Sequence, residues 1–167
     1  FQEVSEASEV RCIDPATGDR MIEEIKSAKN ARDSVGGVVE LIVRGVPVGL
    51  GSYSQAAQRL DALLAAAFMS IPSVKGVEIG LGFKAAGIRG SKVHDEIRYE
   101  AASAPNKKDF HRISNHAGGI EGGISNGEDI VARVAAKPIS TLNRPLKTVD
   151  VVTKQPADAM IERTDHC

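Results

Sequence analysis

A glycine-rich segment at residues 115–127 constrains the fold of this chain more than any other feature. It reads Asn-His-Ala-Gly-Gly-Ile-Glu-Gly-Gly-Ile-Ser-Asn-Gly and holds five glycines between Gly118 and Gly127. Paired glycines adopt positive φ angles without steric cost and let backbone N–H groups approach a ligand closely. The segment has neither the Gly-Lys-Ser/Thr ending of a Walker loop nor the glycine spacing of a dinucleotide-binding fingerprint. From spacing alone, a ligand-binding loop and a tight turn without a ligand are equally open.

The remainder of the chain predicts a mixture of helices and strands. Apolar residues recur at helical spacing in some segments, and β-branched apolar runs indicate strands in others. Because strands do not alternate strictly with helices, we expect an α+β fold rather than a doubly wound parallel sheet. The expected elements are a loop over 14–19, helices over 19–33 (with Asp19 near the N-cap) and 54–69, strands over 38–43, 74–80, 83–89 and 130–136, a long loop over 90–115, extended or irregular chain over 137–154, and a short turn or helix over 158–162.

Composition excludes several classes of protein. The 167 residues correspond to a single domain segment, and 21 Lys and Arg against 22 Asp and Glu leave no general attraction to nucleic acid. The longest apolar run, residues 62–69, is too short to cross a membrane. Two cysteines, Cys12 and Cys167, form no disulfide framework, and the histidines lack the spacing of a helical zinc site. We therefore expect no metal and a reducing compartment, the cytoplasm.

Two short polar segments could carry chemistry. Residues 137–141, Lys-Pro-Ile-Ser-Thr, follow an expected strand, and a lysine with two hydroxyls at a strand end can bind a phosphate. Arg163 lies two residues before Asp165, so a permanent cation could hold an anion beside a carboxylate that moves a proton. Taken alone, the first segment is more often a solvated loop and the second an exposed pair. Arg89, Lys92, His94 and Asp95 form a similar polar cluster.

Several motifs along the chain resemble those of the chorismate synthases, in the same order. The run Ser-Asn-His-Ala-Gly-Gly-Ile-Glu-Gly-Gly-Ile-Ser-Asn-Gly is highly specific, and the motifs together extend over nearly the whole chain. They lie at residues 10–12, 45–51, 60–62, 67–80, 90–91, 95–97, 115–127, 137–138 and 163–167.

This resemblance implies a β-α-β sandwich, in which helices pack between antiparallel sheets, and a homotetramer. The family's reaction is a 1,4-anti elimination of phosphate from 5-enolpyruvylshikimate-3-phosphate (EPSP), which gives chorismate for aromatic amino acid biosynthesis in the shikimate pathway. Such a carbon–oxygen lyase requires reduced FMN although no net oxidation occurs, and NADPH is a candidate reductant. The implied compartment is the cytoplasm, or the plastid in a plant.

The resemblance also implies site residues. Pro72 and Ser73 match a segment whose backbone meets FMN, and Gly122 falls in the flavin-contacting glycine loop. Arg163 matches an arginine at the flavin and substrate site, and Asp165 matches the aspartate that assists proton transfer near flavin N5. A further flavin-binding segment comprises Lys137, Pro138, Ile139, Ser140 and Thr141.

The family's two catalytic histidines and its serine- and arginine-rich flavin motif have no match here. They belong to its N-terminal portion, and the C-terminal signature stops at Cys167. We therefore expect residues 1–167 to be a piece of a longer enzyme. The alternatives are a catalytically incomplete FMN- or phosphate-binding module, and an unrelated phosphate- or nucleotide-binding domain that shares the glycine loop by chance.

Overall fold

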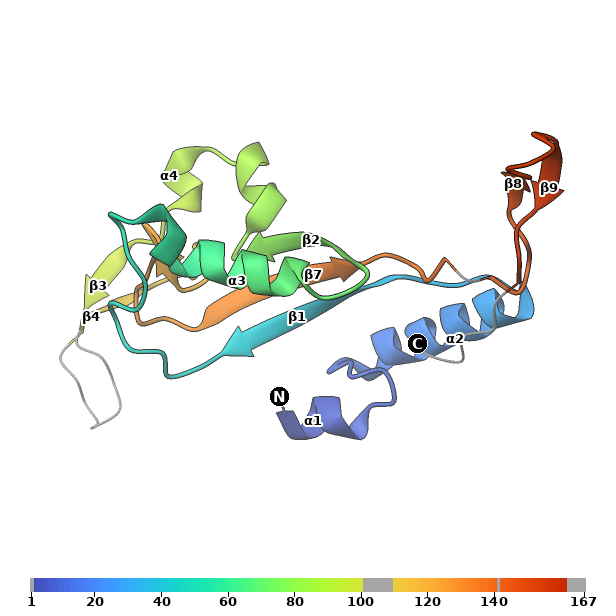
Figure 1. The fold of residues 1–167 in the computed structure, drawn as a ribbon. Coiled ribbons are helices and arrows are strands. Elements are labelled where there is room, and N and C mark those ends of the chain that lie inside the picture. Colours follow the sequence, from blue (N-terminus) through green and yellow to red (C-terminus); the bar gives the residue numbers. More distant parts are fainter. Residues whose placement is uncertain (1, 101–109, 141, 162–167) are drawn as a thin grey trace. The chain divides into compact units, whose positions relative to one another are not determined.

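The computed structural model describes residues 2–100, 110–140 and 142–161 (Figure 1). The chain forms two compact units. One, here called the sheet unit, is Gly37–Ala136, and the other, the terminal unit, combines residues 1–36 with residues 137–167. The sheet unit is therefore a continuous stretch of chain, whereas the terminal unit is assembled from both ends.

Three antiparallel strands in the order β1-β7-β2 form the main sheet (Figure 1). They are β1 (Gly37–Val43), β2 (Val74–Ile79) and β7 (Ile130–Ala136). Their β-branched and aliphatic residues suit a pleated surface. In the central strand β7, Ile130 pairs with Val43, and Ala136 pairs with both Gly37 and Val74. The strands expected at 38–43, 74–80 and 130–136 are confirmed, as is the α+β class.

Helix α3 (Leu60–Met69) packs against β2 on one face of this sheet (Figure 1). Its run Leu-Asp-Ala-Leu-Leu-Ala-Ala-Ala-Phe-Met has small side chains that let a strand approach closely. A helix this apolar normally buries most of its surface. None of its residues is fully buried, however, and Leu63 is 52% exposed.

Shorter elements link the strands of the sheet unit, and most of its buried residues that the structure describes lie where the glycine segment meets the sheet. The buried apolar residues are Val74, Ile120, Ile130 and Ala132, and Ser125 is buried with them. The shorter elements are the 3₁₀ helices η1 (Ala56–Gln58) and η2 (Gly82–Gly87), helix α4 (Gly90–Val93), the antiparallel pair β3 (Ile97–Tyr99) and β4 (Phe110–Arg112), and the hairpin strands β5 (Ile120–Glu121) and β6 (Ile124–Ser125).

The described residues of the terminal unit form two helices and a strand pair. They are α1 (Gln2–Ala7), α2 (Pro15–Asn30), β8 (Lys147–Val149) and β9 (Pro156–Asp158). Asp14 caps α2, because its Oδ2 accepts a hydrogen bond from the Thr17 N–H over 2.9 Å. Pro15 occupies the first helical position, where its missing N–H costs nothing.

Several expected elements were wrong. The loop at 14–19 is the first turn of α2, so Asp14 rather than Asp19 is the N-cap, and the helix ends at Asn30. The helix expected at 54–69 is interrupted by the extended residue Arg59. The strand expected at 83–89 is mostly the 3₁₀ helix η2, and the loop at 90–115 contains α4, β3 and β4. The turn or helix expected from residue 158 begins instead at the last residue of strand β9, whereas the extended or irregular chain expected at 137–154 is confirmed and includes β8.

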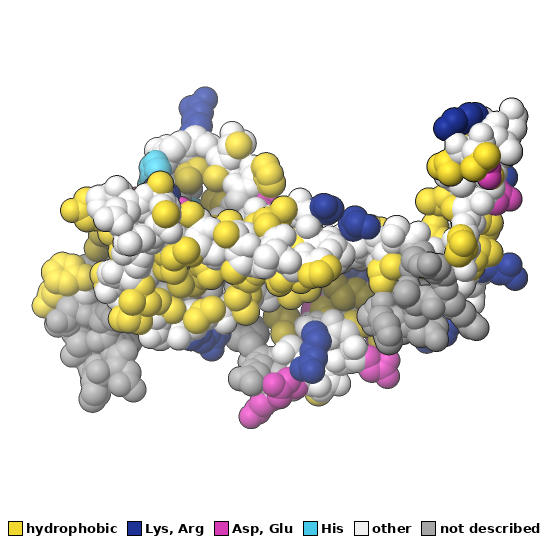
Figure 2. Space-filling model, viewed as in Figure 1, with side chains coloured by type: hydrophobic (Ala, Val, Ile, Leu, Met, Phe, Trp, Pro, Cys, Tyr) yellow, Lys and Arg dark blue, Asp and Glu magenta, His cyan; other side chains and the backbone are white. Residues whose placement is uncertain are grey.

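Strand β1 is exposed along its whole length. Every residue from Gly37 to Val43 is exposed, including the successive residues Val38 (67%) and Val39 (62%), which point to opposite faces. Figure 2 shows the apolar surface of the sheet unit. Within the described part of the chain, no helix has the length and apolarity needed to cross a membrane.

Candidate functional site

The first glycine pair of the segment packs against neighbouring backbone. Gly80, Gly118 and Gly119 have φ angles of 58°, 63° and 78°. A Cβ on Gly118 would collide with the backbone of Gly80, and one on Gly119 would stand 2.5 Å from the Asp129 carbonyl oxygen. The close approach allows the Gly80 N–H to donate to the Val131 carbonyl over 2.9 Å. This pair therefore joins the glycine segment to the sheet.

The second pair forms the turn of the β5–β6 hairpin. Gly122 and Gly123 have φ angles of 60° and 85°, and a tight two-residue hairpin turn with positive φ at both positions favours glycine. Gly123 is enclosed, because a Cβ there would stand 2.8 Å from both Arg59 Cγ and the Ser52 carbonyl oxygen. Gly122 has no other heavy atom within 4 Å of that position. It is therefore the open tip of the hairpin, and its contact with a flavin stays a prediction.

Asp95 holds the start of the glycine segment. Its side chain is 0% exposed, and its Oδ1 accepts hydrogen bonds from Ser114 Oγ (2.5 Å) and the His116 N–H (2.8 Å). Its Oδ2 accepts a third from the Ala117 N–H over 2.9 Å. Burial raises the pKa of the Asp95 carboxyl, but the hydrogen bonds together lower this pKa by more than burial raises it. The net shift is therefore downward. The ionised Asp95 side chain therefore serves as the hydrogen-bond acceptor for the backbone at the start of the glycine segment.

The His116 ring is also fixed. Its Nδ1 lies 3.0 Å from the Val93 carbonyl oxygen, which can only accept, so Nδ1 carries the proton in the neutral ring. The His116 carbonyl in turn accepts a hydrogen bond from the Leu81 N–H over 2.8 Å. The His116 ring thus bonds to Val93, the last residue of α4, and its backbone carbonyl bonds to Leu81, which precedes η2.

Ser125 ties the far side of the hairpin to residues 45–51. It is 2% exposed, and its hydroxyl donates to the Pro47 carbonyl over 2.6 Å and accepts from the Leu50 N–H over 2.9 Å. Its backbone N–H donates to the Leu50 carbonyl, also over 2.9 Å. The glycine-rich connection at 45–51 is thus held against the hairpin.

The predicted flavin residues of the sheet unit lie at two separate places. Pro72 and Ser73 are exposed and follow α3, with Ser73 in a left-handed conformation at φ 72°. The hairpin turn lies at the other end of α3, because the Gly123 carbonyl accepts from the Leu60 N–H. The 10 residues of α3 span about 15 Å. The described residues therefore do not bring Ser73 and Gly122 together.

The predicted segment at 137–141 begins the second part of the terminal unit. Lys137 directly follows the last residue of β7, so its expected place at a strand end is confirmed. Lys137 and Ser140 are exposed, and Lys137 Nζ lies 3.5 Å from the Pro138 carbonyl oxygen. The Ile139 carbonyl accepts from Ser34 Oγ over 2.7 Å. Thr141, Arg163 and Asp165 lie outside the described residues.

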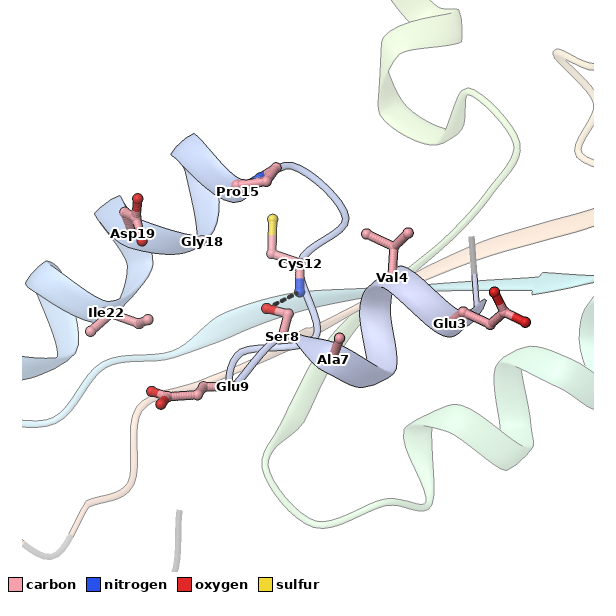
Figure 3. Close-up of a pocket in the computed structure, with 10 residues that line it drawn as sticks. All are labelled: Glu3, Val4, Ala7, Ser8, Glu9, Cys12, Pro15, Gly18, Asp19 and Ile22. Atoms are coloured by element: carbon pink, nitrogen blue, oxygen red, sulfur yellow. Dashed lines mark hydrogen bonds between the residues drawn. The ribbon is translucent and has the colours of Figure 1, made fainter.

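A groove of about 530 Å³ lies between α1 and the start of α2 in the terminal unit (Figure 3). Cys12 stands in it with its N–H bonded to Ser8 Oγ over 3.1 Å. None of its lining residues is a histidine, lysine or arginine that could activate the thiol. None is a predicted site residue either. The lining comprises Glu3, Val4, Ala7, Ser8, Glu9, Cys12, Pro15, Gly18, Asp19 and Ile22.

A smaller hollow of about 230 Å³ lies beside the glycine segment in the sheet unit. Its polar lining residues are His94, Asp95, His116 and Glu121. Among the described residues, no cluster of three or more His, Cys, Asp and Glu side chains could hold a metal ion. Sequence reasoning placed Asp95 only in a polar cluster and a family motif, and it assigned no role to Ser125. The signal for Asp95 was its motif, whereas Ser125 gave none beyond its place in the glycine run.

The chain is similar to known proteins along its whole length. The sequence model of the family described as "Chorismate synthase" matches residues 1–167. A chorismate synthase of Geobacter sulfurreducens is 56% identical over 169 residues, which cover 100% of this chain and 43% of the relative. One of Caldicellulosiruptor bescii is 54% identical over 167 residues, covering 100% of this chain and 42% of the relative.

A solved structure supports the same relationship. A crystal structure of chorismate synthase superposes with a TM-score of 0.77 at 47% identity, covering 84% of this chain and 40% of that one. The chain thus spans about two fifths of the length of the relatives it matches. These likenesses exclude the reading as an unrelated domain with a chance glycine loop. The chain belongs to the chorismate synthase family.

Proposed function

We propose that this protein acts as a chorismate synthase, a carbon–oxygen lyase that eliminates phosphate from EPSP in a 1,4-anti manner to give chorismate. The observation that carries the proposal is the family match over residues 1–167, with relatives of that name at 54–56% identity across the whole chain. The substrate is a small, strongly anionic molecule, and we propose no nucleic acid or membrane partner.

The open hairpin tip supports a role in binding reduced FMN. A planar ring or a phosphate can approach the backbone at Gly122, since no Cβ or neighbouring heavy atom occupies the space beside it. Ser73 holds a backbone conformation that is uncommon for a residue with a side chain, and such residues gather at ligand sites. Reduced FMN, when bound, supplies an electron transiently to an elimination that has no net oxidation. NADPH is the proposed reductant.

We propose binding and proton-transfer roles for three charged side chains of the terminal unit as well. The exposed Lys137 ammonium would neutralise an anionic flavin or substrate group, with Pro138, Ile139, Ser140 and Thr141 forming the remainder of the flavin-binding segment. Arg163 would hold an anionic group through its planar guanidinium. Asp165 would move a proton near flavin N5.

A second candidate function follows from the length of the chain. Because it spans 43% of the Geobacter relative, residues 1–167 on their own would be a catalytically incomplete FMN- or phosphate-binding module. We propose that the complete enzyme is a homotetramer that works in the cytoplasm, or in the plastid of a plant.

An anaerobic assay with EPSP and chemically reduced FMN tests the proposal by following the appearance of chorismate. The complete polypeptide that carries this chain is expected to turn over, and residues 1–167 alone are expected to bind FMN without turnover. Turnover by residues 1–167 would reject the incomplete-module reading. Absence of turnover and of FMN binding in the complete polypeptide would reject the proposed function.

A further inference from the structure

The buried Asp95 carboxylate is arranged for more than filling space. Removing a carboxylate from water is costly unless hydrogen bonds replace its hydration. Here three donors converge on it, namely Ser114 Oγ and the N–H groups of His116 and Ala117. An ionised carboxylate is the side chain that only accepts, through two oxygens, and therefore satisfies all three donors at once. An asparagine would turn an N–H group toward one of them.

The three donors belong to the segment that leads into the β5–β6 hairpin. Directly after Ala117, the Gly118 carbonyl accepts from the Val131 N–H over 3.2 Å, and the Gly119 N–H donates to Asn115 Oδ1 over 2.8 Å. The Asn126 N–H closes the base of the hairpin on the Gly119 carbonyl over 2.9 Å. Asp95 thus fixes the first link of a hydrogen-bonded path that ends at the turn.

We propose that Asp95 is a positioning residue for the flavin: it sets the backbone of the glycine segment and thereby the direction in which the Gly122 tip is presented. The inference rests on the proposed function, because the flavin contact at Gly122 is part of it. Asp95 itself touches the backbone of this segment, so its effect on the cofactor passes through the hairpin.

The test compares variants of the complete polypeptide in two measurements. Hydrogen exchange followed by mass spectrometry reports on the amides of residues 114–121, and a fluorescence titration reports the Kd for FMN. Asp95→Asn loses the acceptor for one N–H group, so the exchange of these amides is expected to rise about tenfold and FMN binding to weaken about tenfold.

Two matched variants separate positioning from general stability. Ala132→Gly weakens the buried centre of β7 at a residue that is 1% exposed and that is not one of the three donors to Asp95. It is expected to lower the unfolding temperature while leaving the FMN Kd unchanged. Ser114→Ala removes one donor and keeps both N–H bonds, so each measured change should be only about twofold to threefold.

Each outcome decides part of the inference. Wild-type exchange in Asp95→Asn would overturn the positioning role, and faster exchange with an unchanged FMN Kd would reduce Asp95 to a stabilising residue. Equal weakening of FMN binding by Ala132→Gly would also overturn the inference. If Asp95→Asn does not fold, Ser114→Ala must still exceed Ala132→Gly in both measurements. Absence of FMN binding in the wild type would instead reject the proposed function, and the exchange data would still decide the local role.

Discussion

Substituting Gly80 by alanine tests how tightly the glycine segment is joined to the sheet. Gly80 begins the turn after β2 with φ 58°, where an alanine costs about 1 kcal/mol in backbone strain alone. Its new Cβ would collide with the His116 carbonyl oxygen and stand 2.6 Å from the Gly118 nitrogen. These are backbone atoms, so no side-chain rotation can relieve the contact.

The expected loss of stability is large for a single methyl group. The overpacking caused by the new methyl group costs about 2 kcal/mol. If the backbones separate, the hydrogen bonds Gly80 N–H to Val131 and Leu81 N–H to His116 are lost as well, each worth about 1 kcal/mol. Together with the strain, Gly80→Ala should lower the free energy of unfolding by about 5 kcal/mol, a large part of the total for a typical domain.

Gly122→Ala is the matched control for this experiment. It has nearly the same φ angle, 60°, but open space where the Cβ would stand, so only the strain of about 1 kcal/mol applies. Urea unfolding of the complete polypeptide, monitored by circular dichroism, measures both losses. Equal losses in the two variants would refute the claim that backbone contact, rather than φ alone, requires glycine at position 80.

Four further outcomes are expected. Burial raises the pKa of Asp95, but hydrogen bonds hold this pKa below the ordinary 3.8. The contribution of Asp95 to stability is therefore complete above about pH 4, and it is lost as the pH falls through the lower pKa of the folded state. Amide exchange measured between pH 5 and about pH 2 would show this loss. Asp14→Ala should lower the melting temperature of α2 by a few degrees, whereas Asp19→Ala, inside the helix, should leave it nearly unchanged; the reverse order would contradict the observed cap. Asp165→Ala should reduce kcat far more than FMN affinity, and Lys137→Ala should weaken FMN binding with a smaller effect on kcat; an unchanged FMN titration for the latter would count against its role.

The sequence predicted the central sheet well because its strands carry an unambiguous pattern. The three strands are short, rich in valine and isoleucine, and bounded by glycine or polar residues. Helix α2 was predicted with the wrong start, since Pro15 and Gly18 indicate a turn by composition. In the structure Pro15 is instead the first helical residue after a capping aspartate.

The sequence indicated individual candidate residues but not how they are arranged. Residue types and the family resemblance indicated Gly122 as a contact residue, and the structure shows an open tip there. Spacing could not reveal that the pair Gly118 and Gly119 serves backbone packing, because both glycine pairs look alike in sequence. Nor could it reveal the role of Asp95, whose partners lie about 20 residues further along the chain.

The pairing of Gly37 with Ala136 has a consequence for how this chain can be cut and rejoined. These residues are the two ends of the sheet unit and lie opposite each other in the β1–β7 ladder, where paired Cα atoms are about 5 Å apart. A segment whose ends already meet can be circularised with a very short linker, or opened elsewhere, without stretching its strands. We therefore expect that residues 37–136 can be circularly permuted, or replaced by the same stretch of a relative, because β1 and β7 both lie within this stretch and move with it.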